Sequence, residues 1–279
     1  MSRPATTFAG DLNLPLRGLR KIFGVLGLSL VTLAGAGAAT REVQVAVLQS
    51  PTLPGATAVS QEAIAIGALN EALAREICQR VAVRCTSHSL PFAEIIPGVE
   101  SGRYQIGIGN VLRTPDRERR LLFSLPLWRS SSRLVGTATA IGRFGGHVQL
   151  PDLRGVTLAV ERGTQQHRYL QEIVGTQKLK LIETASVGES MNLLVQGKAD
   201  FSLMPVRTAY FLLQDAGGNA AVGFAGPALA DHGLGGSVHV ILNKNEADLR
   251  QQVDEALNAM RSDGTFQRIL RRYMPFFAD

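Results

Sequence analysis

Segments with the pattern of β-strands alternate with segments with the pattern of α-helices, and this alternation limits the possible folds more than any other feature. Residues 42–48 (EVQVAVL) are β-branched with alternating polarity, which is typical of a strand. Residues 62–80 carry apolar side chains at helical spacing. The same succession returns further along the chain. Strands separated by helices predict α/β layers with mostly parallel sheets.

The remaining predicted elements follow the same alternation. Further strands are predicted to begin at 81–83 and to occupy 104–109, 155–160, 179–182, 201–204 and 237–242; further helices are predicted at 92–101, from Thr114 onward, and at 163–174, 189–195, 247–261 and 266–273. Thr114 provides an N-cap and Pro115 a first helical position. Residues 101–103 (SGR) lie between a predicted helix and a predicted strand, and residues 196–198 (QGK) do the same later in the chain. Such a repeat is expected of two similar lobes, but it is also common in other α/β proteins.

The first 40 residues have the pattern of a secretory signal peptide. Basic residues precede an apolar run at 22–33, and small residues follow at 34–39. The run is shorter than the roughly 20 apolar residues that a membrane-spanning helix needs. We therefore predict a signal peptide over residues 1–40, cleaved near Ala39, and export to the periplasm. The alternative is an uncleaved membrane anchor.

The net charge argues against nucleic acid as a partner. The chain has 29 basic and 23 acidic residues, of which four basic and one acidic residue lie in the first 40: Arg3, Arg17, Arg20, Lys21 and Asp11. The predicted mature chain therefore has a net charge of only +3. Nucleic-acid binding needs a concentrated basic face.

Cys78 and Cys85 are the two cysteines of the chain. In an exported protein, two cysteines can pair because the compartment is oxidising. We predict a disulfide between them, and the alternative is two free buried thiols. These cysteines and the five scattered histidines do not have the spacing of metal ligands, so we predict no metal site and no cofactor.

Several motifs, taken in order, resemble the amino-acid-type periplasmic solute-binding proteins of bacterial ABC importers. They are IIPGVESG at 95–102, GNVLRTPDR at 109–117, LFSLPL at 122–127, DLRGV at 152–156, GT at 163–164, QGKAD at 196–200 and ALNAMRSDGTF at 256–266. The cysteine spacing is like that of the histidine and lysine/arginine/ornithine binding proteins. Each motif alone is weak, but their order and spacing are specific and cover nearly all of residues 41–275.

This resemblance implies a two-lobed periplasmic binding protein fold of the type II kind, with two α/β lobes joined by two hinge strands. Lobe 1 is expected to comprise residues 41–130 plus 231–279, and lobe 2 residues 131–230. The resemblance also implies a monomer that binds a small carboxylate-bearing solute between the lobes and delivers it to the membrane permease of an ABC importer.

Arg117 matches the arginine with which the family binds the ligand carboxylate. A guanidinium suits this role because it forms two charge-assisted hydrogen bonds with a carboxylate. The alternative is that Arg117 belongs to a solvated set with Arg113, Arg119 and Arg120.

Five other positions match family ligand contacts, and each also has a simpler structural interpretation. Gly163, Thr164 and Gln165 match an anion-binding turn, or form an ordinary helix N-cap. Phe92 matches a residue that packs on the ligand side chain, or belongs to the core. Asn110 matches a residue at the edge of the pocket, or simply ends a strand.

The chain departs from the family where the ligand ammonium would bind. Pro205 stands where an aspartate is common, Leu112 replaces a hydroxyl residue beside the carboxylate, and the segment 49–54 lacks the family aromatic. We therefore expect Leu112 at the ligand, and a ligand that lacks a standard α-amino group. The alternative is that other residues, such as Glu161 or Asp215, bind the amino group.

Two further functions remain open from the sequence. Some members of this fold are periplasmic dehydratases that act on prephenate-like carboxylates, and Glu161 would then be the general acid. Alternatively, the chain is an accessory protein that has lost its ligand and kept a periplasmic partner protein. The sequence has no Ser–His–Asp order and no Gly-rich nucleotide loop. We therefore predict a binding protein without catalytic residues.

Overall fold

The computed structural model describes residues 41–50, 61–215 and 221–274; the side chains of residues 61–64 and of Asp215 lie outside this description. The predicted signal peptide, with its cleavage site near Ala39, also lies outside the described residues. Within the described ranges, no helix combines the length and apolar character needed to cross a membrane.

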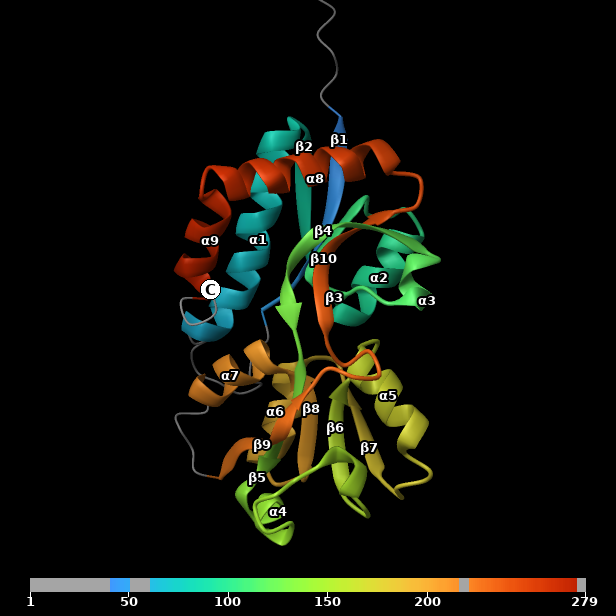
Figure 1. The fold of residues 1–279 in the computed structure, drawn as a ribbon, viewed down its shortest axis with the longest axis vertical. Coiled ribbons are helices and arrows are strands. Elements are labelled where there is room, and N and C mark those ends of the chain that lie inside the picture. The colour runs from blue at the N-terminus through green and yellow to red at the C-terminus, as the bar shows by residue number, and fades with distance from the viewer. Residues whose placement is uncertain (1–40, 51–60, 216–220, 275–279) are drawn as a thin grey trace, which may run out of the picture. The chain divides into compact units, whose positions relative to one another are not determined.

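Two five-stranded sheets organise the fold (Figure 1). The first has the order β2 (Arg84–Leu90), β1 (Glu42–Leu48), β3 (Ile106–Leu112), β10 (Gly236–Asn243), β4 (Leu121–Ser130), and the second β7 (Lys180–Thr184), β6 (Thr157–Glu161), β8 (Phe201–Pro205), β5 (Ser132–Thr137), β9 (Val222–Leu229). We call the part built on the first sheet lobe 1 and the part built on the second lobe 2. In each sheet the fourth strand, β10 or β5, runs antiparallel to both neighbours. The two sheets share one topology, which confirms the predicted α/β fold.

Helices cover both faces of each sheet. Lobe 1 carries α1 (Gln61–Val81), α2 (Phe92–Glu100), α3 (Pro115–Glu118), α8 (Ala247–Ser262) and α9 (Thr265–Tyr273). Lobe 2 carries α4 (Ala138–Arg143), a 3-10 turn (Leu150–Asp152), α5 (Gln165–Ile173), α6 (Val187–Val195) and α7 (Val206–Asp215). In lobe 1, the side of the sheet covered by α1, α8 and α9 contains Leu73 and Val253, and the side covered by α2 contains Ile95. The apolar side chains at helical spacing therefore form the face of each of these helices that packs on the sheet.

Helix α7 also reaches across to lobe 1, where it packs against α1. Its Phe211 is 3% exposed and belongs to the same apolar cluster as Leu69 and Met274. One side chain of lobe 2 is thus part of the lobe 1 core.

Two crossings connect the sheets. Strands β4 and β5 are separated by Ser131 alone, and residues 230–235 lead from β9 back to β10. The buried Ser132 hydroxyl donates to the carbonyl oxygen of Leu234 at 2.6 Å and accepts from Nε2 of Gln166 at 2.8 Å. The two crossings are therefore hydrogen-bonded to each other and to α5. The exact lobe boundaries, 41–130 plus 231–279 and 131–230, stay a prediction.

The predicted start of a strand at 81–83 is wrong. Helix α1 continues to Val81, and Ala82 then adopts a left-handed conformation with φ of 57°. The N–H of Val83 donates to the carbonyl oxygen of Cys78 at 3.3 Å, which closes the helix, and the strand begins at Arg84. The two valines favour a strand locally, but the turn that ends the helix decides their conformation.

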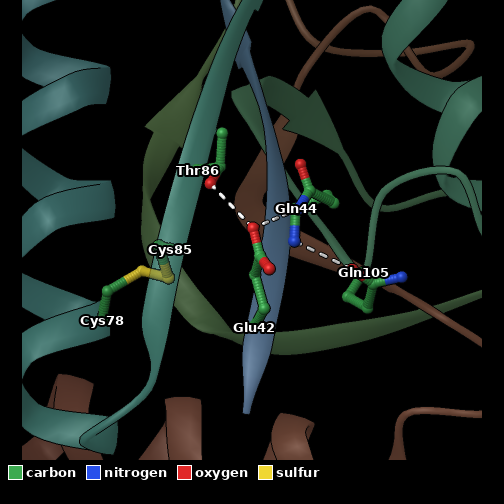
Figure 2. Close-up of a disulfide and its surroundings, with 6 residues drawn as sticks. All are labelled: Glu42, Gln44, Cys78, Cys85, Thr86 and Gln105. Atoms are coloured by element: carbon green, nitrogen blue, oxygen red, sulfur yellow. Dashed lines mark hydrogen bonds between the residues drawn. A yellow bond between two sulfur atoms is a disulfide. The ribbon is translucent and has the colours of Figure 1, made fainter. Parts of the chain in front are cut away.

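The predicted disulfide is confirmed. Figure 2 shows Cys78, near the end of α1, joined to Cys85 at the start of β2, with Cα atoms 6.1 Å apart. Strand β2 lies at the edge of its sheet. The bond therefore fastens an edge strand to the long helix beside it.

We expect the double variant Cys78→Ser, Cys85→Ser to lose at most about 2–3 kcal/mol of unfolding free energy, because the closed loop is short. Neither cysteine lines the cavity described below, so solute affinity is expected to stay within about twofold. Urea unfolding and calorimetry of both proteins measure the two effects. A variant that fails to fold, or that binds much more weakly, would contradict this estimate.

Candidate functional site

A cavity of about 70 Å³ lies between lobe 1 and lobe 2. Lobe 1 lines it from β1, α1, α2, β3, α3 and β4, and lobe 2 from β6, α5, α6, β8 and α7. Six of the seven residues predicted to contact a ligand line this cavity: Phe92, Asn110, Leu112, Arg117, Thr164 and Gln165. The seventh, Gly163, lines a neighbouring cavity.

Arg117 is the buried cation at this cavity, with 5% of its surface exposed. Its Nη1 donates to the carbonyl oxygen of Leu112 at 3.0 Å, and its Nη2 to that of Gly163, across in lobe 2, at 3.5 Å. It forms no ion pair with any carboxylate in the described part of the chain. Burial, and then the positive charges of Arg120 and Arg168, lower the pKa of Arg117 to about 10. The side chain therefore stays charged at neutral pH and keeps N–H groups available for an anion.

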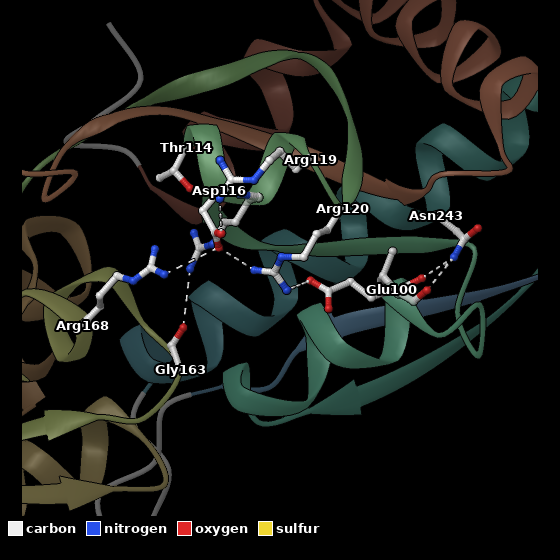
Figure 3. Close-up of polar contacts among 10 residues, drawn as sticks. Glu100, Thr114, Asp116, Arg119, Arg120, Gly163, Arg168 and Asn243 are labelled. Carbon is white, nitrogen blue, oxygen red and sulfur yellow. Dashed lines mark hydrogen bonds and ion pairs between the residues drawn. The ribbon is translucent and has the colours of Figure 1, made fainter.

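The neighbouring arginines are neutralised by other groups. Asp116 accepts from Arg119 at 2.8 Å and from Arg120 at 2.7 Å, and it lies 3.7 Å from a guanidinium nitrogen of Arg168 on α5 (Figure 3). The hydrogen bond from Arg120 is the largest cause of the lowered pKa of Asp116. Arg117 thus differs from its exposed neighbours and is not one of a solvated set.

Helix α3 owes its start, and the position of Arg117, to the residues before it. The hydroxyl of Thr114 accepts from the N–H of Arg117 at 3.4 Å, and Pro115 occupies the first turn. The predicted N-cap and first helical position are confirmed. A cap at this point sets the direction in which Arg117 leaves the helix.

Lobe 2 presents the beginning of α5 to the same cavity. Thr164 caps this helix, since its hydroxyl accepts from the N–H of His167 at 3.1 Å. Gly163 has φ of +76°, and a Cβ added there would lie 3.3 Å from Cα of Ala93 in lobe 1. Glycine therefore permits both the turn and the close approach of the two lobes. The helix N-terminus adds N–H donors that favour an anion.

The lobe 1 wall combines apolar and polar groups. The guanidinium of Arg117 lies over the ring of Phe92, 5.8 Å from its centre. Asn110 adopts a left-handed conformation with φ of 54°, and its side-chain oxygen accepts from Nε1 of Trp128 at 3.3 Å. Asparagine is one of the few residues other than glycine that adopt this conformation readily. Trp128 is a lining residue that the sequence analysis did not identify.

Glu161 is the buried acid of the site. It ends β6, is 8% exposed and lines the cavity. Burial raises the pKa of its carboxyl to about 8. That carboxyl has no hydrogen-bond or ion-pair partner among the residues the structure describes. Glu161 is therefore mostly protonated at neutral pH.

Other residues considered for the ammonium site take different places. Pro205 lines the cavity, and so does Arg207, whose guanidinium lies 5.6 Å from the ring centre of Trp128. Asp200 accepts from the N–H of Thr157 at 2.8 Å and pairs with Arg143, away from the cavity. The side chain of Asp215 is outside the described residues. Arg207 follows Pro205 closely, but no sequence motif points to it.

A second cavity of about 260 Å³ lies on the other side of Arg117. Phe92, Arg117, Thr164 and Gln165 line both cavities and so form the wall between them. Across the described residues, no group of three or more His, Cys, Asp or Glu side chains is placed to hold a metal ion.

Known proteins resemble this chain in sequence and in fold. The lysine/arginine/ornithine-binding periplasmic protein of Escherichia coli (strain K12) is 28% identical over 209 residues, which cover 73% of this chain and 77% of that protein. The histidine-binding periplasmic protein of Salmonella typhimurium is 25% identical over the same length and coverage. The solved structure of an ancestral arginine-binding protein bound to arginine superimposes with a TM-score of 0.69 at 20% identity, and covers 84% of this chain and 98% of that one.

The family assignment follows from a match along most of the chain. Residues 47–276 match the sequence model of the bacterial extracellular solute-binding proteins, family 3. The two-lobed fold and the cavity between the lobes agree with this match. The chain belongs to the bacterial extracellular solute-binding proteins, family 3.

Proposed function

We propose that this protein is the periplasmic solute-binding protein of an ABC importer, and that it binds a small carboxylate-bearing solute, an amino acid or a related organic acid, between its lobes. The observation that carries the proposal is the state of Arg117. This guanidinium is buried with no ion-pair partner in the described ranges, which costs free energy, and a bound carboxylate would offset that cost.

The proposed binding mode uses groups from both lobes. Arg117 donates to the solute carboxylate from lobe 1, and the N-terminus of α5, with Thr164 and Gln165, donates from lobe 2. Gly163 lets the two lobes approach, while Phe92, Leu112 and Asn110 contact the rest of the solute. A ligand that touches both lobes stabilises their closed arrangement, because it binds that arrangement more tightly than the open one.

The relatives support the cellular part of the proposal. Their names place them in the periplasm and assign them basic amino acids or histidine. We infer that this chain is exported, is cleaved near Ala39, acts as a monomer and delivers its solute to a membrane permease. The lobe boundaries given above belong to the same proposal.

A thermal-shift screen of the protein purified from the periplasm tests the proposal. The panel contains amino acids, keto acids, dicarboxylates and aromatic acids. A solute at 100 times its dissociation constant should add about 2.7 kcal/mol to the unfolding free energy. For a chain of this size, that corresponds to a rise of roughly 5–10 °C in the melting temperature.

Other outcomes of the screen would point to the alternatives. No stabilisation by any member of the panel would contradict solute binding and favour an accessory protein with a periplasmic partner. A separate assay of product formation from a prephenate-like acid tests the other alternative: product would favour a dehydratase, in which the protonated Glu161 acts as a general acid.

A further inference from the structure

We propose that Glu161 is the counter-charge for a positively charged nitrogen on the solute, and that binding of this solute drives the proton from Glu161 into water. This inference rests on the proposed function and adds a second charge to the solute. The solute would be a zwitterion or a cation that carries a carboxylate, with its carboxylate on Arg117 and its cation on Glu161.

The position of Glu161 supports this role. The side chain ends β6 and faces the cavity from lobe 2, whereas Arg117 faces it from lobe 1. The two do not form an ion pair with each other, so the guanidinium and the carboxyl are each available to a molecule placed between them. A carboxyl that is buried with no partner among the described residues is unusual, because folding leaves most such groups paired or exposed.

The chemistry favours a cation on Glu161 over an anion. An ionised carboxylate accepts hydrogen bonds only, and in a cavity closed to water it is stabilised most by an ammonium or guanidinium. A second anionic group on the solute would require Glu161 to keep its proton, and the protonated carboxyl could donate only one hydrogen bond to that anion. A buried charge pair between solute and protein is therefore the more stable use of this group.

None of the charged groups described around Glu161 is placed to act as its ion-pair partner. Two cations line the same cavity, Arg117 from α3 and Arg207 from α7. On β7, Glu183 lies near the ring of His167 from α5, with 3.0 Å between Oε1 and Nε2. On α6, Glu189 accepts from the N–H of Ala185. Neither β8 nor α6 places a charged side chain in the cavity wall.

The protonation of Glu161 makes the inference measurable. Because burial raises its pKa to about 8, roughly nine in ten molecules carry the proton at pH 7. A cation beside the carboxylate lowers this pKa and releases the proton. Binding at pH 7 should therefore release about 0.9 proton per solute, and the apparent affinity should rise up to roughly tenfold as the pH rises from 7 to 9.

Four six-carbon probes separate the two charges. L-lysine carries both an α-ammonium and a terminal ammonium, L-norleucine only the first, 6-aminohexanoate only the second, and hexanoate neither. Calorimetry measures the affinity of each for the protein, for Glu161→Gln, for Arg117→Ala and for the control Glu172→Gln, an exposed acid of the same lobe. Buffers with different ionisation enthalpies give the number of protons released.

If Glu161 binds a cation, at least one of the probes with an ammonium group should bind more tightly than hexanoate. Glu161→Gln should then weaken the binding of that probe by roughly 10- to 100-fold and leave the binding of hexanoate unchanged. Proton release should disappear in the same variant and persist in Glu172→Gln. If carboxylates bind through Arg117 while Glu161→Gln changes neither affinity nor proton release, the inference is wrong and the proposed function stands. If none of the probes binds at millimolar concentration, the inference is wrong, and the thermal-shift panel decides on the proposed function. If solutes bind but their binding does not depend on Arg117, both are wrong.

Discussion

Replacing Arg117 with alanine is expected to abolish measurable solute binding and to leave the stability of the solute-free protein almost unchanged. The guanidinium would make two charge-assisted hydrogen bonds to a carboxylate, each worth about 1.5–3 kcal/mol. Their loss corresponds to a decrease in affinity of roughly 100-fold or more. Calorimetric titration with the solute identified by the thermal-shift screen measures this effect.

The stability expectation follows from the surroundings of Arg117 in the free protein. Its truncation removes two hydrogen bonds to carbonyl oxygens, but it also removes a buried charge that has no ion-pair partner in the described part of the chain. These effects oppose each other, so the melting temperature should move by no more than about 3 °C. Arg119→Ala is the matched control, because Arg119 lies at the end of the same helix with a side chain 70% exposed. A large loss of stability in Arg117→Ala would instead mark the residue as structural.

Replacing Glu161 with glutamine is expected to remove a decrease of the unfolding free energy that the parent protein shows as the pH rises toward 8. Burial raises the pKa of Glu161 from the ordinary 4.5 to about 8. Between these values the folded protein keeps a proton that the unfolded chain loses, so the contribution of Glu161 to stability falls as the pH rises and is lost above pH 8. The limiting slope is about 1.4 kcal/mol per pH unit.

The comparison of variant and parent isolates this contribution. From pH 5 to pH 8, the unfolding free energy of the parent should fall by roughly 3–4 kcal/mol more than that of Glu161→Gln. Urea denaturation across this range gives both curves, and other titrating groups cancel in the difference. Glu172→Gln should follow the parent. Parallel curves for Glu161→Gln and the parent would show that the carboxyl titrates normally and is not buried in solution.

The sequence pattern predicted strands such as β1 and β6, but it did not predict β4, β5 or β9, the strands that lead into and out of the crossings. Strands such as β1 and β6 have apolar, β-branched sequences that fit a buried sheet, and the helices beside them have regular apolar spacing. Strand β9 (VGFAGPAL) contains two glycines and a proline, which disfavour a strand locally. Its pairing with β5 comes from distant residues, so local pattern does not reveal it.

The candidate site was predicted where a motif surrounds the residue and missed where only the fold places it. Arg117 and Thr164 lie in motifs with a defined spacing, and both line the cavity. Trp128 and Arg207 lie on β4 and α7 and reach the cavity only through the packing of whole elements. Glu161 was considered from the sequence, but its burial, with no partner among the residues that the structure describes, depends on the neighbouring strands and on lobe 1.

The burial of Phe211 of lobe 2 in the lobe 1 core bears on how readily the two lobes separate. Moving the lobes apart would expose this ring to water, and the full burial of such a side chain is worth about 1.5–3 kcal/mol. Without a solute, the protein therefore already favours the closed arrangement of the lobes. The contact responsible, that of Phe211, lies outside the cavity. Part of the affinity for any solute is in this way determined outside the pocket, by how strongly the free protein already favours the closed arrangement.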